Sequence, residues 1–135
     1  MDNITVIGLD LAKNIFQLCG MTRHGRVVYR RQVTRGKLIE AVIHLPRCMI
    51  VMEAYAGSNY WGREFSALGF EVELIAAQFV KPFVKSNKND SIDAEAICEA
   101  ALRPQMRFVS AKSKEQQDIQ NLHRIRARLV RPSED

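Results

Sequence analysis

Apolar positions in the first third of the chain follow the two-residue period and the short apolar runs of β-strands. Residues 4–12 (ITVIGLDLA) are apolar and β-branched, residues 14–22 follow closely, and residues 25–33 alternate clearly after the turn residues RHG. Three strands joined by such short links predict an antiparallel meander.

Beyond the meander, the pattern alternates between helical spacing and further strands. The predicted segments are a helix over 35–45, a strand over 47–54, a helix over 57–69, a strand over 70–76, a short helix or loop over 77–85, and a helix over 90–103. Pro46 ends the first helix, and the second has Ser58 as its expected N-cap and Gly69 as its C-terminal stop. This order predicts an α/β fold with a mixed sheet and flanking helices, which is the order of a ribonuclease-H-like fold.

The last segment has a different pattern, typical of a long polar helix over 113–131. Its apolar residues follow the 3-then-4 spacing of a coiled-coil seam at Leu122, Ile125 and Leu129. We therefore divide the chain into a globular domain over 1–110 and the start of a coiled-coil or helical segment over 111–135. Because a seam of this kind needs a partner, we expect the sequence to stop partway through a longer architecture.

Length and composition fit one soluble globular domain. The chain has 135 residues and is 47% hydrophobic, with no apolar run long enough to span a membrane and no signal-peptide pattern at its start. We therefore expect a cytoplasmic protein with no membrane partner. Its three cysteines, Cys19, Cys48 and Cys98, are widely spaced, which favours reduced thiols over a disulfide framework or a zinc site.

The net charge of +5 is gathered in three basic stretches, over 23–37, 80–88 and 123–131. A solvent-exposed charged surface with no binding role would explain any one of these stretches. The three together favour nucleic-acid binding and such a surface equally. The candidate nucleic-acid contacts are Lys13, Lys81, Lys85, Lys88, Arg124 and Arg128. Three aromatic residues could stack on bases, although aromatics at helical spacing more often belong to a core; they are Tyr55, Tyr60 and Trp61.

Two carboxylates stand at the ends of apolar strand patterns. Asp10 follows TVIGL and Glu53 follows MIVM, and a buried carboxylate costs several kcal/mol unless it is paired or bound to a cation. Either acid alone could lie at an exposed strand tip or pair with a base. Both together are harder to explain in that way, because the first and fourth strands of a mixed sheet tend to be adjacent and parallel. Their ends would then meet at the edge where open α/β sheets place ligands.

A second pair of acids, Asp90 and Asp93, begins the last predicted helix of the globular domain. Taken alone, the pair is typical of an N-cap at Asp90 with an acid three residues later. If this helix begins at the same sheet edge, four carboxylates converge, and divalent cations relieve their repulsion. Oxygen ligands without His or Cys suit Mg²⁺ or Mn²⁺, and two such ions support phosphodiester cleavage or transfer.

Four segments together resemble the DEDD transposases of bacterial insertion sequences, the IS-one-ten family, which includes the Piv and MooV invertases. They are VIGLDLAKNIFQL, VMEAYAGSNYWGREFSALGFEVELI, QFVKPFVKSNKNDSIDAEAICEA and QQDIQNLHRIRARLV. The resemblance implies a RuvC-like, ribonuclease-H-like domain. It assigns the catalytic, metal-binding signature to Asp10, Glu53, Asp90 and Asp93. The third motif reads KNDSIDA and departs from the commonest family form at Asn89 and Ser91, while both acids remain.

The resemblance further implies Mg²⁺-dependent DNA cleavage and strand exchange, guided by a structured RNA and carried out by dimers or tetramers. The family also has a C-terminal domain with a catalytic serine, and no serine here matches it, so we expect the isolated chain not to recombine DNA. Two alternatives stay open. The chain could be a non-catalytic module for nucleic-acid binding or oligomerisation, or a stand-alone RuvC-like nuclease.

Overall fold

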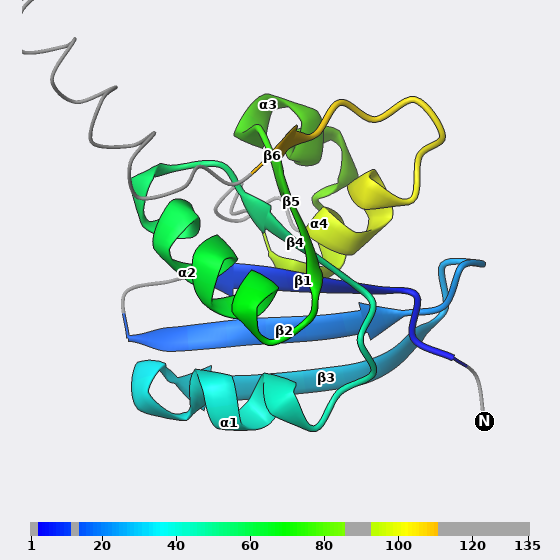
Figure 1. Ribbon diagram of the computed structural model, residues 1–135. Helices are drawn as coiled ribbons and strands as arrows, with labels where there is room; N and C mark the ends of the chain where they lie inside the picture. The colour runs from blue at the N-terminus through cyan, green and yellow to red at the C-terminus, as the bar shows by residue number, and fades with distance from the viewer. Residues whose placement is uncertain (1–2, 12–13, 86–92, 111–135) are drawn as a thin grey trace, which may run out of the picture.

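The computed structural model describes residues 3–11, 14–85 and 93–110. The elements are β1 (Val6–Leu11), β2 (Ile15–Met21), β3 (Val27–Thr34), the 3₁₀ turn η1 (Arg35–Lys37), α1 (Leu38–Ile43), β4 (Met49–Glu53), α2 (Ala56–Ala67), β5 (Glu71–Ile75), α3 (Ala77–Val80), the 3₁₀ turn η2 (Lys81–Phe83), α4 (Ala94–Ala101) and β6 (Val109–Ser110). They build one six-stranded sheet in the order β3-β2-β1-β4-β5-β6, with helices packed against it (Figure 1).

The strand directions confirm the predicted mixed sheet. Strands β1, β2 and β3 form the antiparallel meander, and β1, β4 and β5 are parallel neighbours. The short strand β6 pairs antiparallel with β5 and was not predicted, because two residues carry no usable period. A meander followed by alternating helices and strands around β1 and β4 is the ribonuclease-H-like arrangement.

Two apolar layers cover the two faces of the sheet. Ile7 and Leu9 of β1 belong to the core formed with α1 and α2, in which Phe65 is fully buried. Val6 of β1 and Val51 of β4 belong to the second core, formed with α3 and α4. Because side chains alternate along a strand, the positions two residues apart from Val6 and Val51 face α4.

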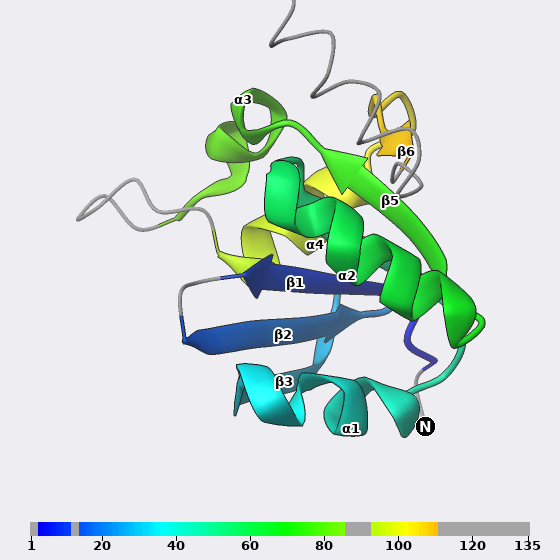
Figure 2. The same ribbon diagram turned by 60° about the vertical axis from the view of Figure 1, so that its left-hand side comes forward.

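Helix α4 lies unusually close to the centre of β1, which Gly8 permits. A Cβ at Gly8 would stand 2.4 Å from the Ala94 carbonyl oxygen and 2.7 Å from Cys98 Sγ. Any side chain larger than hydrogen would therefore push the helix away. Figure 2 shows the resulting placement, with the start of α4 beside the end of β1.

The starts of α2 and α4 differ from the sequence prediction. The predicted stop at Gly69 is confirmed, because Gly69 has a φ of +99° just after the end of α2. Helix α2 begins at Ala56 with Tyr55 at its N-cap, so the assignment of Ser58 as the cap is wrong. Helix α4 begins at Ala94 and has Asp93 as its N-cap, so the cap is not at Asp90.

The predicted helix over 113–131 and the domain boundary at 110/111 concern residues outside the described part of the chain. Within that part, no helix is long and apolar enough to cross a membrane.

Candidate functional site

The adjacency of β1 and β4 brings Asp10 and Glu53 to one edge of the sheet. The register of β1 and β4 pairs Gly8 with Val51 and Leu9 with Met52, so the next positions along the two strands are Asp10 and Glu53. Both follow the alternation that faces α4, and both side chains are half-buried. The sequence prediction of neighbouring parallel strand ends is therefore confirmed.

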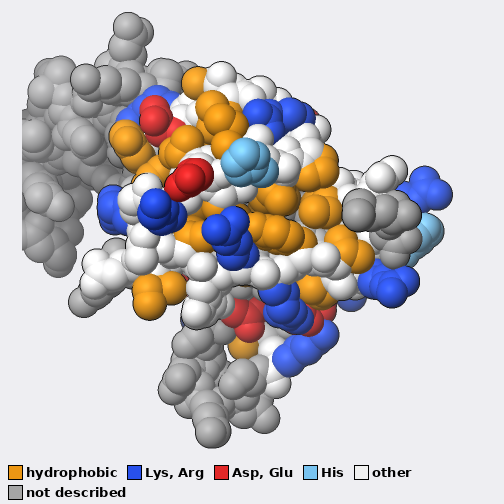
Figure 3. Space-filling view, turned by 90° about the horizontal axis from the view of Figure 1, so that it is seen from below, with side chains coloured by type: hydrophobic (Ala, Val, Ile, Leu, Met, Phe, Trp, Pro, Cys, Tyr) orange, Lys and Arg blue, Asp and Glu red, His pale blue; other side chains and the backbone are white. Residues whose placement is uncertain are grey.

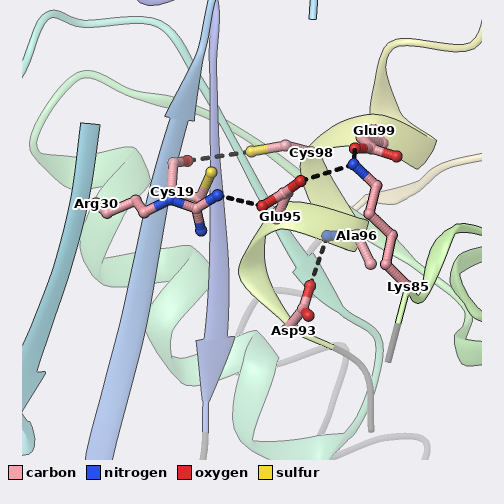
Figure 4. Close-up of polar contacts among 8 residues, drawn as sticks. All are labelled: Cys19, Arg30, Lys85, Asp93, Glu95, Ala96, Cys98 and Glu99. Atoms are coloured by element: carbon pink, nitrogen blue, oxygen red, sulfur yellow. Dashed lines mark hydrogen bonds and ion pairs between the residues drawn. The ribbon is translucent and has the colours of Figure 1, made fainter. Parts of the chain in front are cut away.

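Asp93 reaches the same edge from α4. Its backbone is extended, and its Oδ1 accepts a hydrogen bond of 2.7 Å from the Ala96 backbone N–H, which is the N-cap interaction (Figure 4). The close contact of Ala94 with Gly8 sets the position of the residue just before it. Asp93 therefore lies just before the helix as its cap, and Asp90 lies outside the described residues.

The negative charges of Glu53 and Asp93 act electrostatically on Asp10. Partial burial, followed by the negative charges of Glu53 and Asp93, raises the pKa of Asp10 to about 6. A carboxylate between two others is hard to ionise in this setting, which is the condition that a bound cation relieves. Among the described residues, no group of three or more His, Cys, Asp or Glu side chains stands close enough to hold a metal ion as it is.

A buried hydroxyl fixes the turn that carries Glu53. Ser58, in the first turns of α2, is fully buried, and its Oγ donates a hydrogen bond to the backbone oxygen of Glu53. The next residue, Ala54, donates its N–H to the Ile75 oxygen of β5 at 2.8 Å. The end of β4 is therefore held from both sides, and Ser58 acts on the site rather than on the helix cap.

The predicted basic contacts have mixed placements. Lys81 is exposed in η2, whereas the Lys85 ammonium lies 2.9 Å from Glu95 and 2.8 Å from Glu99 (Figure 4). These two carboxylates raise the pKa of Lys85. The others, Lys13, Lys88, Arg124 and Arg128, lie outside the described residues.

Arg30 is a site neighbour that the sequence did not single out. It reaches from β3 to Glu95 of α4 and forms a charged hydrogen bond with it, which together with Lys85 lowers the pKa of Glu95. Arg30 belongs to the basic stretch over 23–37, but its partner is 65 residues away. Only the fold could reveal this pairing.

A surface hollow of about 410 Å³ lies between β2, β3 and the start of α4. Its wall includes Arg30, Arg31, Asp93 and Glu95, so basic side chains lead up to one of the candidate acids. Figure 3 views the molecule from the side of α1 and β3, where separate Lys and Arg side chains are spread over the surface. The arrangement offers positive charge beside the acidic edge. The fold and this edge define a ribonuclease-H-like α/β domain with its candidate site at the carboxyl ends of parallel strands.

Comparison with known proteins identifies the family. A transposase family model of the DEDD IS110 type matches residues 7–134. The protein named "Probable family 20 transposase" of Pseudomonas aeruginosa is 55% identical over 96% of this chain and 38% of its own length. The transposase for insertion sequence element IS1111A of Coxiella burnetii is 50% identical, over 97% and 36% respectively. The transposase for element IS1328 of Yersinia enterocolitica is 48% identical, over 97% and 39%.

The chain therefore belongs to the family of IS110-type DEDD transposases, which confirms the resemblance found in its motifs. It spans less than two-fifths of the length of these relatives.

Proposed function

We propose that the chain supplies the carboxylate set of a divalent-metal site for DNA strand cleavage and exchange in insertion-sequence transposition. In this proposal Asp10, Glu53 and Asp93, together with Asp90, bind Mg²⁺ or Mn²⁺. The observation that carries it is the convergence of Asp10, Glu53 and Asp93 at one sheet edge, where burial and the charges of Glu53 and Asp93 raise the pKa of Asp10. Membership of the DEDD transposase family supports the assignment.

The chemistry of the donor set fits these ions. Carboxylate oxygens without His or Cys are the ligands that Mg²⁺ and Mn²⁺ prefer. Bare carboxylates repel one another, which agrees with the lack of a closed ligand group among the described residues; a cation would have to draw them together. When bound, a pair of such ions would stabilise the attacking and leaving oxygens of a phosphodiester.

The chain's own residues have distinct parts in this proposal. Asp10 must give up its proton before it can bind a cation, and its pKa of about 6 allows this at neutral pH. Ser58 holds the backbone of Glu53. Asp93 uses Oδ1 to cap α4, so its Oδ2 is the oxygen that would be available to hold a cation.

DNA is the proposed partner, and Arg31, in the wall of the hollow beside Asp93, is placed to meet its phosphates. Arg30 of the same wall is already paired with Glu95. Lys81 offers an exposed ammonium, whereas Lys85 would have to exchange Glu95 and Glu99 for phosphate. The guide RNA and the assembly into dimers or tetramers come from the family resemblance and belong to the same proposal.

Metal binding tests the proposal directly, because capping and ligation by Asp93 respond differently to amide substitution. Asparagine is as good an N-cap as aspartate, so Asp93→Asn should keep the helix while removing the charge that binds the cation. We expect Asp93→Asn and Asp10→Asn each to weaken Mn²⁺ binding by about tenfold or more, measured by calorimetry.

The matched control is Glu71→Gln, which changes an exposed carboxylate at the start of β5, away from the acidic edge. It should leave Mn²⁺ affinity unchanged. If the two aspartate variants also bind Mn²⁺ like the parent chain, the proposed site is wrong.

A further inference from the structure

Tyr55 occupies a position for which local structure does not account. It is the N-cap residue of α2, where Ser, Thr, Asp or Asn would stabilise the helix, and its side chain makes no capping hydrogen bond to the described part of that helix. Its side chain is 48% exposed, and neither core cluster of the described chain includes it. An aromatic residue that neither caps nor fills a core indicates another use, because breaches of local rules gather at functional sites.

The ring of Tyr55 packs closely against Gly57 in the first turn of α2. A Cβ at Gly57 would lie 2.8 Å from Cε2 of the ring and 3.1 Å from its Cζ and hydroxyl oxygen. Glycine is unfavourable inside helices, yet only glycine lets the ring lie this close. Tyr55 and Gly57, two departures from good helix-start chemistry two positions apart, therefore serve one purpose, which is to hold the Tyr55 ring against the helix start and half-exposed to solvent.

The ring stands beside the acidic edge. Its hydroxyl approaches the backbone oxygen of Leu11, at the end of β1, at 3.4 Å. Burial of part of the phenol, and the charges of Glu53 and Asp10, raise the pKa of Tyr55, while nearby Arg35 acts in the opposite direction. The ring therefore lies within electrostatic reach of Glu53 and Asp10, two candidate metal ligands, and of the exposed Arg35.

We propose that Tyr55 is a stacking platform for a nucleobase of the DNA strand whose phosphate lies at the carboxylates. This inference rests on the proposed function, because the carboxylates place a phosphate and so a nucleobase near the ring. Stacking on an aromatic face is tolerant of base identity, which suits a position next to the cleaved phosphate. The exposed Arg35 side chain is placed to contact the phosphate backbone of the same DNA strand.

The test separates stacking on bases from binding to phosphates. Single-stranded oligo-dT and an abasic strand of equal length carry the same phosphates, but only the first has bases to stack. Fluorescence anisotropy of end-labelled strands in Mg²⁺ would give both affinities. We expect Tyr55→Ala to weaken oligo-dT binding about tenfold or more and to leave binding of the abasic strand unchanged.

Two further variants make the result specific. Tyr55→Phe keeps the ring and should bind oligo-dT like the parent chain. Tyr60→Ala removes another half-exposed tyrosine of α2, whose ring packs edge-on against Trp61 at 5.0 Å, and it should bind both strands like the parent. Thermal melting of each variant checks that the fold is kept.

The outcomes also distinguish this inference from the proposed metal site. Equal losses for both strands, no loss with Tyr55→Ala, or no base-dependent binding by the parent chain would each overturn the stacking role. If Tyr55→Ala weakened binding of the RNA equivalent of oligo-dT but left binding of oligo-dT unchanged, the assignment to DNA would be overturned. Mn²⁺ binding of Tyr55→Ala should equal that of the parent; if the parent binds no Mn²⁺, it is the proposed metal site that fails.

Discussion

Substitution of Gly8 by alanine tests how the acidic edge is built, because Gly8 carries no functional group. The added Cβ would lie 2.4 Å from the Ala94 oxygen and 2.7 Å from Cys98 Sγ, both on α4. Ordinary contact begins at 3.4 Å, so the carbonyl must retreat by about 1 Å. A backbone atom of a packed helix cannot move alone, so we expect the start of α4 to shift away from β1.

The cost to the fold should be moderate. Overpacking of this kind costs about 1–3 kcal/mol, and replacing glycine by alanine within a strand returns about 0.5–1 kcal/mol. The net loss should therefore be about 0–2.5 kcal/mol in the free energy of unfolding, measured by urea denaturation. A domain of this size survives such a loss.

The effect on the proposed metal site should exceed what this loss of stability explains. Asp93 directly precedes Ala94, so a shift of about 1 Å moves its carboxylate away from Asp10, whereas Mg²⁺ demands oxygen ligands at 2.0–2.1 Å with near-ideal geometry. We expect Mn²⁺ affinity to fall about tenfold or more in calorimetry at a temperature where the variant is fully folded. The pKa of Asp10, followed by NMR, should fall as one negative neighbour recedes.

Gly36→Ala is the matched control, since a Cβ at Gly36 meets no described atom within 4 Å. It should keep both stability and Mn²⁺ affinity. If Gly8→Ala is folded and binds Mn²⁺ as tightly as the parent, the contact between α4 and β1 does not position Asp93 for metal binding, and the reasoning is refuted.

Three further predictions concern single side chains. Because the folded state holds the Asp10 proton more tightly than the unfolded chain does, Asp10 should contribute a loss of stability to the metal-free protein as pH rises from 3.8 to about 6, opposite in sign to the contribution of Glu95. Asp10→Asn should remove that pH step and be more stable at pH 7 by ~1 kcal/mol, after allowance for partial exposure. Ser58→Ala should cost about 1–3 kcal/mol in urea denaturation because it removes the donor to the part-buried backbone oxygen of Glu53, while Ser66→Ala at an exposed position of α2 should change stability by less than about 0.5 kcal/mol. Asp93→Ala should lose about 1 kcal/mol of capping that Asp93→Asn keeps; equal stability of the two would contradict the cap.

The strands and their neighbours were predictable because their rules are short-ranged or topological. The apolar periods located each of the first five strands, and the adjacency of β1 and β4 followed from the meander and the alternating elements after it. That adjacency alone placed Asp10 next to Glu53. The family motif then named Asp93, but the close approach of α4 that brings it there depends on Gly8, a residue more than 80 positions earlier.

The errors at the two helix starts arose because tertiary contacts competed with local preference. Ser58 is a good N-cap residue by type, but its hydroxyl donates to the Glu53 carbonyl instead, and the helix begins earlier. At α4, two aspartates three residues apart both satisfied the capping rule, and the structure uses Asp93. The capping rule ranks residue types only. It does not show whether the Ser58 hydroxyl will accept from a nearby backbone N–H of the helix or donate to the Glu53 carbonyl at the end of β4.

In the proposed site, capping by Asp93 would prepare it for metal binding. The Ala96 N–H fixes one carboxylate oxygen, and Gly8 fixes the distance of the helix from β1, so the carboxyl group is held in place while its other oxygen stays available. Preorganisation of this kind lowers the cost of assembling like charges, because the chain has already lost the conformational freedom that ligation would remove. The raised pKa of Asp10 shows the electrostatic cost that remains in the metal-free chain. A single residue can therefore stabilise the helix and prepare the site, and Asp93→Asn is the substitution that separates the two roles.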